Sequence, residues 1–310
     1  MIINIQDDIL KLNSIKVLGK LLVDKTTKKN IMWATDAYDY AGELYERNKE
    51  ITVQSITGDN ASVLKTRARK ELENQEKRTR QHAEVFTPVW LCNMMNNHVD
   101  EIWFGRKDVF NAEGEPTSAI AFNEDKTWHD YVDSRRLEIT CGEAPFLVSR
   151  YDVETGEMIP IERRIGILDR KLRVVNENAA SEAEWMEWAI KAFQATYGYE
   201  FQGDNLLIAR VNFLMTFEEY IESRWKRKPT SKEYEKIANI IAWNIWQMDG
   251  LTGTIPYCKA AEETLQMTMF DLLGEGLDSS EEEETQPLCR IYDWKGKNAS
   301  VEFVSLKEKR

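Results

Sequence analysis

The sequence predicts an α/β fold with a parallel sheet, and two strand-to-turn junctions carry this prediction. Residues 137–140 read as a short buried strand with an acid, Glu138, near its end, and small residues follow at 141–144. Apolar residues from Pro145 onward can then open a helix. Residues 199–201 have the character of a second strand, which ends near Glu200. In open α/β sheets a ligand lies across the carboxyl ends of adjacent strands, so these acids mark a candidate site, although small residues also serve ordinary turns.

Composition supports a folded protein of one large domain or two ordinary ones. The chain has 310 residues, of which 42% are hydrophobic and 30% charged, enough for a substantial core. No apolar run approaches the roughly 20 residues of a membrane span, and residues 1–8 lack the features of a signal peptide. We therefore expect a cytoplasmic protein with no membrane partner. The 4 cysteines show no paired spacing, so neither a disulfide framework nor a metal site is expected.

The charge of the chain is strongly negative but uneven. A net charge of −12 argues against a general polyanion binder, because the long-range field repels nucleic acid. Residues 65–80 nevertheless carry seven basic side chains against three acids, which could form a local face for a phosphate backbone. The alternative is a solvated helix surface.

The first part of the chain reads as a mixed, largely helical segment. We expect an apolar buried stretch at 31–35, a helix at 41–48 and a long polar helix at 61–83. A second helix begins near residue 89, with Thr87 as its N-cap and Pro88 in its first turn.

The middle of the chain combines an expected insertion with well-marked helices. Residues 150–178 read as an inserted hairpin. Helices are expected at 181–197, capped by Ser181 with Glu184 at the reciprocal position, and at 206–217 and 231–247.

A C-terminal hairpin and a nuclease-like pair of charged residues are also indicated by the sequence. Residues 289–294 and 299–304 read as a C-terminal hairpin, and 278–285 as an acidic loop. Asp169 and Lys171 form the D-x-K half of a nuclease-like metal site, for which chance is the simpler explanation because no partner acid is evident.

Four segments together resemble the N6-adenine DNA methyltransferases of restriction–modification systems. Residues 84–88 (EVFTP) are similar to their (Q/E)-x-(F/Y)-T-P segment, and residues 137–147 (LEITCGEAPFL) to L-(D/E)-P-A-C-G-x-G-x-F-L. Residues 199–201, followed by IARVN at 208–212, are similar to their acid and A-R-x-N motif, and residues 244–251 to N-I-x-x-x-D-x-L.

The resemblance implies a site for S-adenosylmethionine. The T-P segment would help to bind the methionine end, Glu200 would hold the ribose, and Asp249 would meet the adenine. Ile139 and Ala144 depart from the motif, replacing its Pro and its second Gly. The implied cofactor-binding residues are Phe86, Thr87, Pro88, Glu138, Cys141, Gly142, Phe146, Glu200 and Asp249.

The same resemblance implies an overall organisation. From Trp33 onward the chain is similar to the restriction endonuclease subunit M group. The implied fold is α/β, a Rossmann-like S-adenosylmethionine-dependent methyltransferase core with a helical N-terminal segment and an inserted hairpin. The expected division is 1–83 for the N-terminal segment and 84–310 for the methyltransferase-like domain.

The catalytic motif of the family is missing. These enzymes use (N/D/S)-P-P-(Y/F), whose polar groups accept hydrogen bonds from the adenine amine and whose ring stacks on the flipped base. The nearest tetrapeptide is Thr254-Ile255-Pro256-Tyr257, which makes Pro256 and Tyr257 weak catalytic candidates.

Three functions therefore stay open. The first is an S-adenosylmethionine-binding, DNA adenine-N6 methyltransferase-like component of a restriction–modification or phage-defence system, acting on double-stranded DNA with a second methyltransferase, specificity or restriction subunit. The second is a catalytically silent subunit that binds DNA or protein. The third is a metal-dependent nuclease component that uses acids of the region around Asp152 and Asp169. The expected DNA-binding residues are Lys65, Arg67, Arg69, Lys77, Arg78, Arg80, Arg163, Arg164, Arg170, Lys226 and Arg227.

Overall fold

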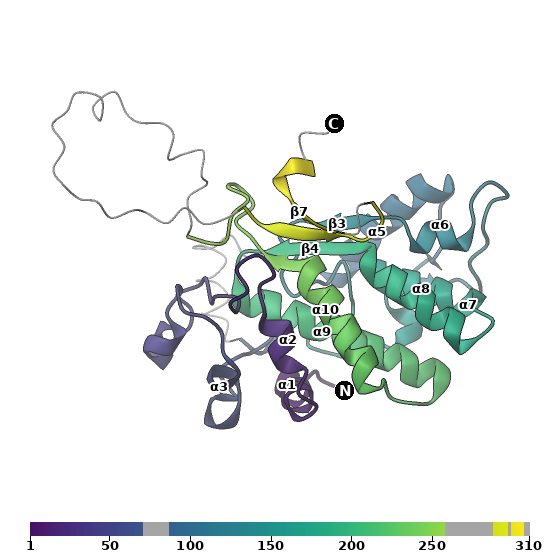
Figure 1. Cartoon of the computed structure of the whole chain (residues 1–310). Coiled ribbons are helices and arrows are strands. Elements are labelled where there is room, and N and C mark those ends of the chain that lie inside the picture. The colour runs from purple at the N-terminus through teal and green to yellow at the C-terminus, as the bar shows by residue number, and fades with distance from the viewer. Residues whose placement is uncertain (71–86, 258–287, 297–298, 307–310) are drawn as a thin grey trace, which may run out of the picture.

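A small parallel sheet organises a mixed α/β fold (Figure 1). The computed structural model describes residues 1–70, 87–257, 288–296 and 299–306. Strands β3 (Arg136–Glu138), β4 (Thr196–Glu200) and β5 (Ile245–Gln247) lie in the order β3-β4-β5. Both pairs are parallel, so the carboxyl ends of all three strands meet at one edge of the sheet.

Two pairs of helices connect the three strands. Helices α7 (Ile167–Asn178) and α8 (Glu182–Gln194) lie between β3 and β4, and α9 (Gly203–Trp225) and α10 (Ser231–Asn244) lie between β4 and β5. Ser181 caps α8 by accepting from the Glu184 N–H, as its sequence predicts. Thr230 and Glu233 form a full capping box at the start of α10.

The two faces of the sheet are covered differently. Helices α8, α9 and α10 contact β4, and α9 and α10 contact β5, on one face. The other face carries the hairpin of β6 (Arg290–Asp293) and β7 (Ala299–Glu302), followed by the short helix η8 (Val304–Leu306). In Figure 1 this hairpin lies above the sheet and the helices below it. Its apolar side chains pack with those of the sheet: Tyr197, Tyr199, Trp246, Met248, Ile291 and Phe303.

The N-terminal segment shares the main core. Helices α1 (Ile5–Ser14) and α2 (Leu18–Leu22) pack on α9, and α2 also packs on α10. The apolar stretch at 31–35 is largely buried, as expected. Short elements follow: η1 (Asp39–Ala41), η2 (Glu43–Tyr45), α3 (Val53–Ile56), η3 (Gly58–Asn60) and η4 (Arg67–Arg69).

A second group of elements precedes β3. It contains α5 (Val89–Phe104), the two-residue strands β1 (Asn111–Ala112) and β2 (Glu115–Pro116), and α6 (Trp128–Val132). The short helix η5 (Ile161–Arg163) follows β3. Asn96 of α5 donates to the carbonyls of Phe146 and Ile165, which ties this helix to the segment after β3.

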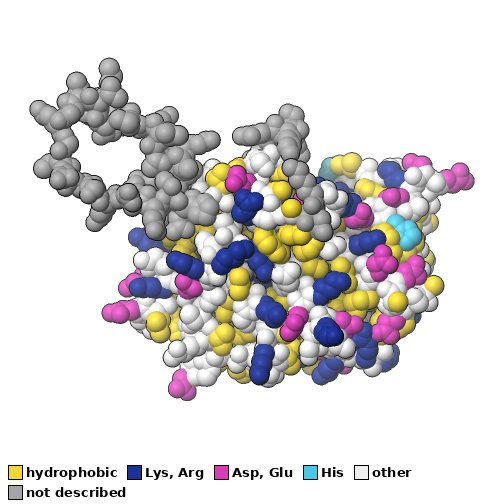
Figure 2. Space-filling view, in the orientation of Figure 1, with side chains coloured by type: hydrophobic (Ala, Val, Ile, Leu, Met, Phe, Trp, Pro, Cys, Tyr) yellow, Lys and Arg dark blue, Asp and Glu magenta, His cyan; other side chains and the backbone are white. Residues whose placement is uncertain are grey.

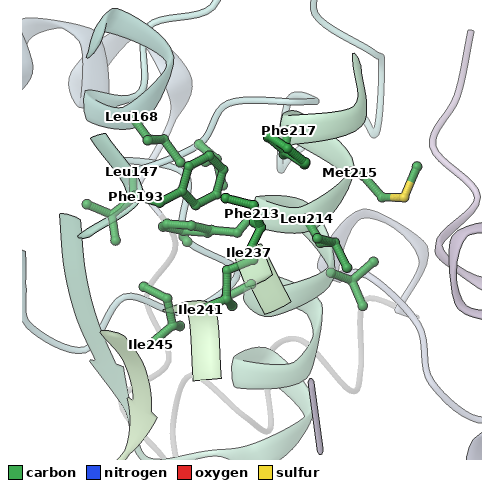
Figure 3. Close-up of a cluster of buried hydrophobic side chains, with 14 of the residues drawn as sticks. Leu147, Leu168, Phe193, Phe213, Leu214, Met215, Phe217, Ile237, Ile241 and Ile245 are labelled. Carbon is green, nitrogen blue, oxygen red and sulfur yellow. The ribbon is translucent and has the colours of Figure 1, made fainter. Parts of the chain in front are cut away.

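The centre of the core lies where α9 crosses the other helices. Figure 3 shows Phe213 and Phe217 of α9 beside Phe193 of α8 and Leu168 of α7. Ring centroids of Phe193 and Phe213 are 6.1 Å apart, and those of Phe193 and Phe217 are 5.9 Å apart, nearly perpendicular in both pairs. Helix α9 is buried on nearly all sides, which explains its weak amphipathic pattern.

Several sequence expectations are corrected. In the expected hairpin at 150–178, only the Tyr151–Met158 bridge pairs, and most of its second half is helix α7. Its apolar residues recur at helical spacing, and eight of the helix residues are buried. Of the expected helix at 61–83, residues 61–70 form a turn and η4, and 71–83 lie outside the described residues.

Smaller corrections concern the boundaries of other elements. The expected helix at 41–48 is replaced by short 3-10 turns, and the helix at 231–247 ends at Asn244 because its last three residues form β5. Pro88, rather than Thr87, is the N-cap of α5, and no side chain caps that helix. Helix α9 and the C-terminal hairpin lie where the sequence predicts. The acidic loop at 278–285 lies outside the described residues.

Among the described residues, no helix is both long enough and apolar enough to cross a bilayer.

Candidate functional site

The candidate site is the edge where β3, β4 and β5 end. Strand β3 is followed by a turn in which Thr140, Gly142 and Ala144 all have positive φ, so the helix expected after this strand does not form. The turn bends back over β4, because the Cys141 N–H donates to the Tyr199 carbonyl at 2.9 Å. Backbone N–H groups of such a turn can face an anionic ligand.

Glu200 joins the turn to β4. Its Oε2 accepts from the Gly142 N–H at 2.8 Å, and its Oε1 accepts from the N–H groups of Phe201 and Gln202 at 3.0 and 3.1 Å. The side chain is buried at 7% exposure. The acid that would hold the ribose therefore already orders the turn. Ribose hydroxyls would compete with the Gly142 N–H for Oε2.

The turn approaches β4 closely where Gly198 lies. A Cβ at Gly198 would lie 3.0 Å from Leu147 Cδ1 and 3.2 Å from Cys141 Sγ. The Cys141 side chain is thus packed against the strand, and burial raises the pKa of its thiol well above the usual range. The Ala144 methyl is also buried. The backbone of the turn is therefore available to a ligand, whereas the side chains of Cys141 and Ala144 are not.

Glu138 differs from the other acids of the site. It is half-buried at the end of β3, and among the described residues it has no hydrogen-bond or ion-pair partner. Burial raises the pKa of its carboxyl to about 7. A carboxyl held without a partner in a partly dry setting is typical of a site that binds a cation or a hydroxyl.

The first turn of α5 lies near this acid. Thr87 and Pro88 are half-buried, and the Cys92 thiol lies 3.4 Å from the Thr87 carbonyl. Burial raises the pKa of the Cys92 thiol to about 12, with the Glu138 charge as a further contribution. The expected T-P segment therefore lies close to Glu138, while Phe86 is outside the described residues. Phe146 is half-buried beyond the turn, and its carbonyl accepts from Asn96 of α5.

Asp249 shapes the loop after β5. Its Oδ1 accepts from the N–H groups of Leu251 and Thr252, at 2.8 and 3.5 Å. The Met248 N–H donates to the Glu200 carbonyl at 3.1 Å, so this loop starts directly beside the end of β4. Tyr199 also faces the loop, because a Cβ at Gly250 would lie 2.9 Å from its hydroxyl. The structure thus brings Glu138, Gly142, Glu200 and Asp249 to one edge.

The weak catalytic candidates lie on the same side. Tyr257 is 52% exposed, and its ring packs edge-on against Phe201, which follows Glu200, with centroids 5.6 Å apart. The Arg47 guanidinium lies 5.3 Å from the centre of the Tyr257 ring. Pro256 is buried. Phe201 and Arg47 received no role from the sequence, because the segment 199–201 drew attention only to Glu200 and Arg47 lies in no recognisable motif.

The A-R-x-N motif holds the fold together. The fully buried Arg210 donates to the carbonyls of Ile245, Leu21 and Val23, and burial lowers its pKa to about 10. Asn212 donates to the Glu143 carbonyl and to the Tyr151 hydroxyl. These two residues position the ends of β5 and of the turn after β3.

The sequence reading missed how the N-terminal segment borders the site. Gln247 at the end of β5 bonds both the N–H and the carbonyl of Met32, at 2.8 and 2.9 Å. Gly203, at the start of α9, donates to the Trp33 carbonyl. The buried character of 31–35 was the only signal of this contact.

Several of the expected DNA-binding residues that the structure describes are occupied in ion pairs. Arg164 and Arg170 are buried and paired with Glu219 and Asp100, so the prediction that they contact DNA is corrected. Arg227 is paired with Glu182 and Glu233, and Arg163 with Glu115. Lys226 is exposed, and Lys65, Arg67 and Arg69 lie in and beside η4. Lys77, Arg78 and Arg80 lie outside the described residues.

The nuclease-like pair does not form a site. Asp169 and Lys171 lie on helix α7, and both are buried. Asp169 accepts from the Ser149 N–H and hydroxyl, and Lys171 donates to the carbonyls of Ser134 and Ala195. The Asp152 carboxylate accepts from the N–H groups of Glu154 and Thr155 in the same turn. Within the described part of the chain, no group of acids, histidines and cysteines could hold a metal ion.

Comparisons with protein-family models, with curated proteins and with solved structures found no match to this chain.

Proposed function

We propose that the chain binds S-adenosylmethionine across the ends of β3, β4 and β5, as a cytoplasmic component similar to DNA adenine-N6 methyltransferases of restriction–modification systems. The observation that carries the proposal is Glu138, a half-buried acid without a described partner beside a turn of backbone N–H groups. The methionine ammonium would pair with Glu138, and the methionine carboxylate would face the turn.

Residues at the ends of the neighbouring strands would hold the remaining parts of the cofactor. The ribose would lie at Glu200, which already faces the turn, and the adenine near Asp249. A sheet with this strand order and these acids is compatible with a Rossmann-like methyltransferase core. The helices on a single face support only the general α/β class.

Calorimetric titration of the full chain with S-adenosylmethionine tests the proposal. We expect micromolar binding, and we expect Glu138→Gln to weaken it by roughly 10- to 100-fold, because a charge-assisted hydrogen bond is lost. Glu154→Gln is the matched control, since Glu154 is an exposed acid on the turn at 152–156. Absence of binding at millimolar cofactor, or equal effects of the two variants, would refute the proposed site.

A catalytically silent subunit is the second candidate, favoured by the missing (N/D/S)-P-P-(Y/F) motif. In the nearest tetrapeptide, isoleucine stands where the motif has its first proline. The ring of its one aromatic residue, Tyr257, packs against Phe201. Transfer of a labelled methyl group to duplex DNA by the chain alone distinguishes the candidates. Transfer that is lost in Tyr257→Ala would favour an enzyme. No transfer by a chain that binds the cofactor would favour a subunit whose partner completes the site.

A further inference from the structure

A basic groove lies between α2 and α10. Lysines of α2, of the loop after it and of α10 line a groove of about 490 Å³. The groove is defined by Lys20, Val23, Lys25, Lys232, Glu235, Lys236 and Asn239. Figure 2 shows dark blue side chains gathered over the middle of the face that carries α2 and α10. On a chain of net charge −12, such a concentration requires an explanation.

One wall of the groove is a stripe along α10. Lys232, Lys236, Asn239 and Trp243 recur at steps of four, three and four residues, so they lie on one face of the helix. This stripe extends for about 16 Å along the helix axis. Lys20 and Lys25 form the opposite side, and Lys28 lies next to it, because its ammonium donates to the Lys25 carbonyl.

The acids near the groove do not neutralise it. Glu235 pairs with Lys20 at 3.5 Å, while both side chains stay about half exposed. Asp24 is buried and accepts from the N–H and hydroxyl of Thr27. Burial lowers the pKa of Lys25, and the charges of Arg210, Lys28 and Lys20 lower it further. The cations therefore repel one another, and an anion in the groove would relieve this repulsion.

Aromatic rings continue the stripe at its end. The Lys25 and Lys28 ammonium groups lie 5.7 and 5.3 Å from the centre of the Trp243 ring. The Trp243 and Tyr292 ring centroids are 5.4 Å apart, and those of Tyr292 and Trp294 are 4.3 Å apart. All three rings are half-buried, so each keeps part of its surface in solvent.

We propose that this groove binds single-stranded nucleic acid, with phosphates along the lysines and a base on Trp243. A positive groove beside aromatic rings is the combination that single strands require, because the phosphates are neutralised and unpaired bases can stack. In a duplex the bases are already stacked on one another, so the aromatic rings would contribute little. This proposal does not depend on the cofactor site.

Fluorescence anisotropy with a fluorescein-labelled 12-nucleotide oligothymidine and the full chain is the test. We expect binding at low salt. The logarithm of the affinity should fall with the logarithm of salt concentration at a slope of about −3.5, because the four lysines of the groove and the adjacent Lys28 each release about 0.7 counterion. Lys25→Gln with Lys28→Gln should reduce the steepness by about 1.4. Trp243→Leu should weaken binding by about 5- to 150-fold, with the slope unchanged.

Lys49→Gln with Lys107→Gln is the matched control, because both lysines are exposed and outside the groove. Thermal unfolding of each variant identifies a loss of binding that comes from misfolding, and the lysine pair keeps the test valid if Trp243→Leu does not fold. No binding at low salt, or equal effects of the two lysine pairs, would overturn the proposal that the groove is the binding site. A duplex that binds as tightly as the single strand, regardless of Trp243, would overturn the single-strand assignment.

Discussion

Glu138 is the residue whose surroundings differ most from those of an ordinary surface acid. Burial alone raises the pKa of its carboxyl to about 7, and no described cation opposes this. The nearby Cys92 and Cys141 thiols have raised pKa values and stay protonated near neutral pH. The folded protein therefore holds the Glu138 proton more tightly than the unfolded chain does.

A dependence of stability on pH follows. An acid with a raised pKa supports the folded state below its unfolded pKa of about 4.5, and this contribution is lost as the pH rises through about 7. We expect Glu138→Gln to be more stable than the parent chain at pH 8 and close to it at pH 4.5. Urea unfolding at the two pH values measures this. An equal difference at both would show that Glu138 is not the group that titrates.

At the scale of elements, close backbone approach decides which glycines matter. A Cβ at Gly203 of α9 would lie 1.8 Å from the Met32 carbonyl oxygen, whereas one at Gly19 of α2 would meet no atom within 4 Å. We expect Gly203→Ala to lower the free energy of unfolding by about 2–4 kcal/mol. Gly19→Ala should raise it by about 0.5–1 kcal/mol, because alanine favours a helix. Urea unfolding of the pair tests the contact, and a tolerated Gly203→Ala would refute it.

The sequence predicted the elements with strong local signals. The Ser181 cap and the strand ending at Glu200 lie where their patterns indicate. Helix α7 was mistaken for a strand because Asp169, Arg170 and Lys171 interrupt its apolar pattern, and only the tertiary contacts show that they are buried.

The candidate site was predictable only in part. The acids at the strand ends could be named because an α/β sheet gathers such ends at one edge. The pairing of Gln247 with Met32 joins residues 215 positions apart, and no local pattern encodes it. Strand β5 was missed for the same reason, since its three residues continue the helical pattern of α10.

At the scale of the whole molecule, the N-terminal segment and the sheet share one core. Tyr38 donates to Asp204 of α9 at 2.8 Å, Lys11 pairs with Glu218, and Arg210 donates to the carbonyls of Leu21 in α2 and of Val23 after it. One hydrophobic cluster includes residues from Ile5 to Ile245. The division expected between residues 83 and 84 therefore does not separate two cores.

A truncated chain tests this unity. We expect a fragment of residues 61–310 to lack a cooperative unfolding transition. The fragment lacks α1 and α2, so the side of α9 that they cover is exposed and the Arg210 guanidinium loses two of its acceptors. Near-ultraviolet circular dichroism during urea unfolding, with the full chain as reference, measures the loss. A fragment that unfolds as sharply as the full chain would contradict a shared core.

Strand β3 has backbone groups on the edge that faces away from β4. It pairs with β4 on one side, and the Arg136 N–H points to the Ala195 carbonyl, so the Leu137 N–H points the opposite way. Leu137 and Ile139 are 47% and 60% exposed. An extended segment of another polypeptide that joined here in the parallel sense would end beside Glu138. A loop that followed such a segment would then begin at the edge of the sheet where Glu200 lies.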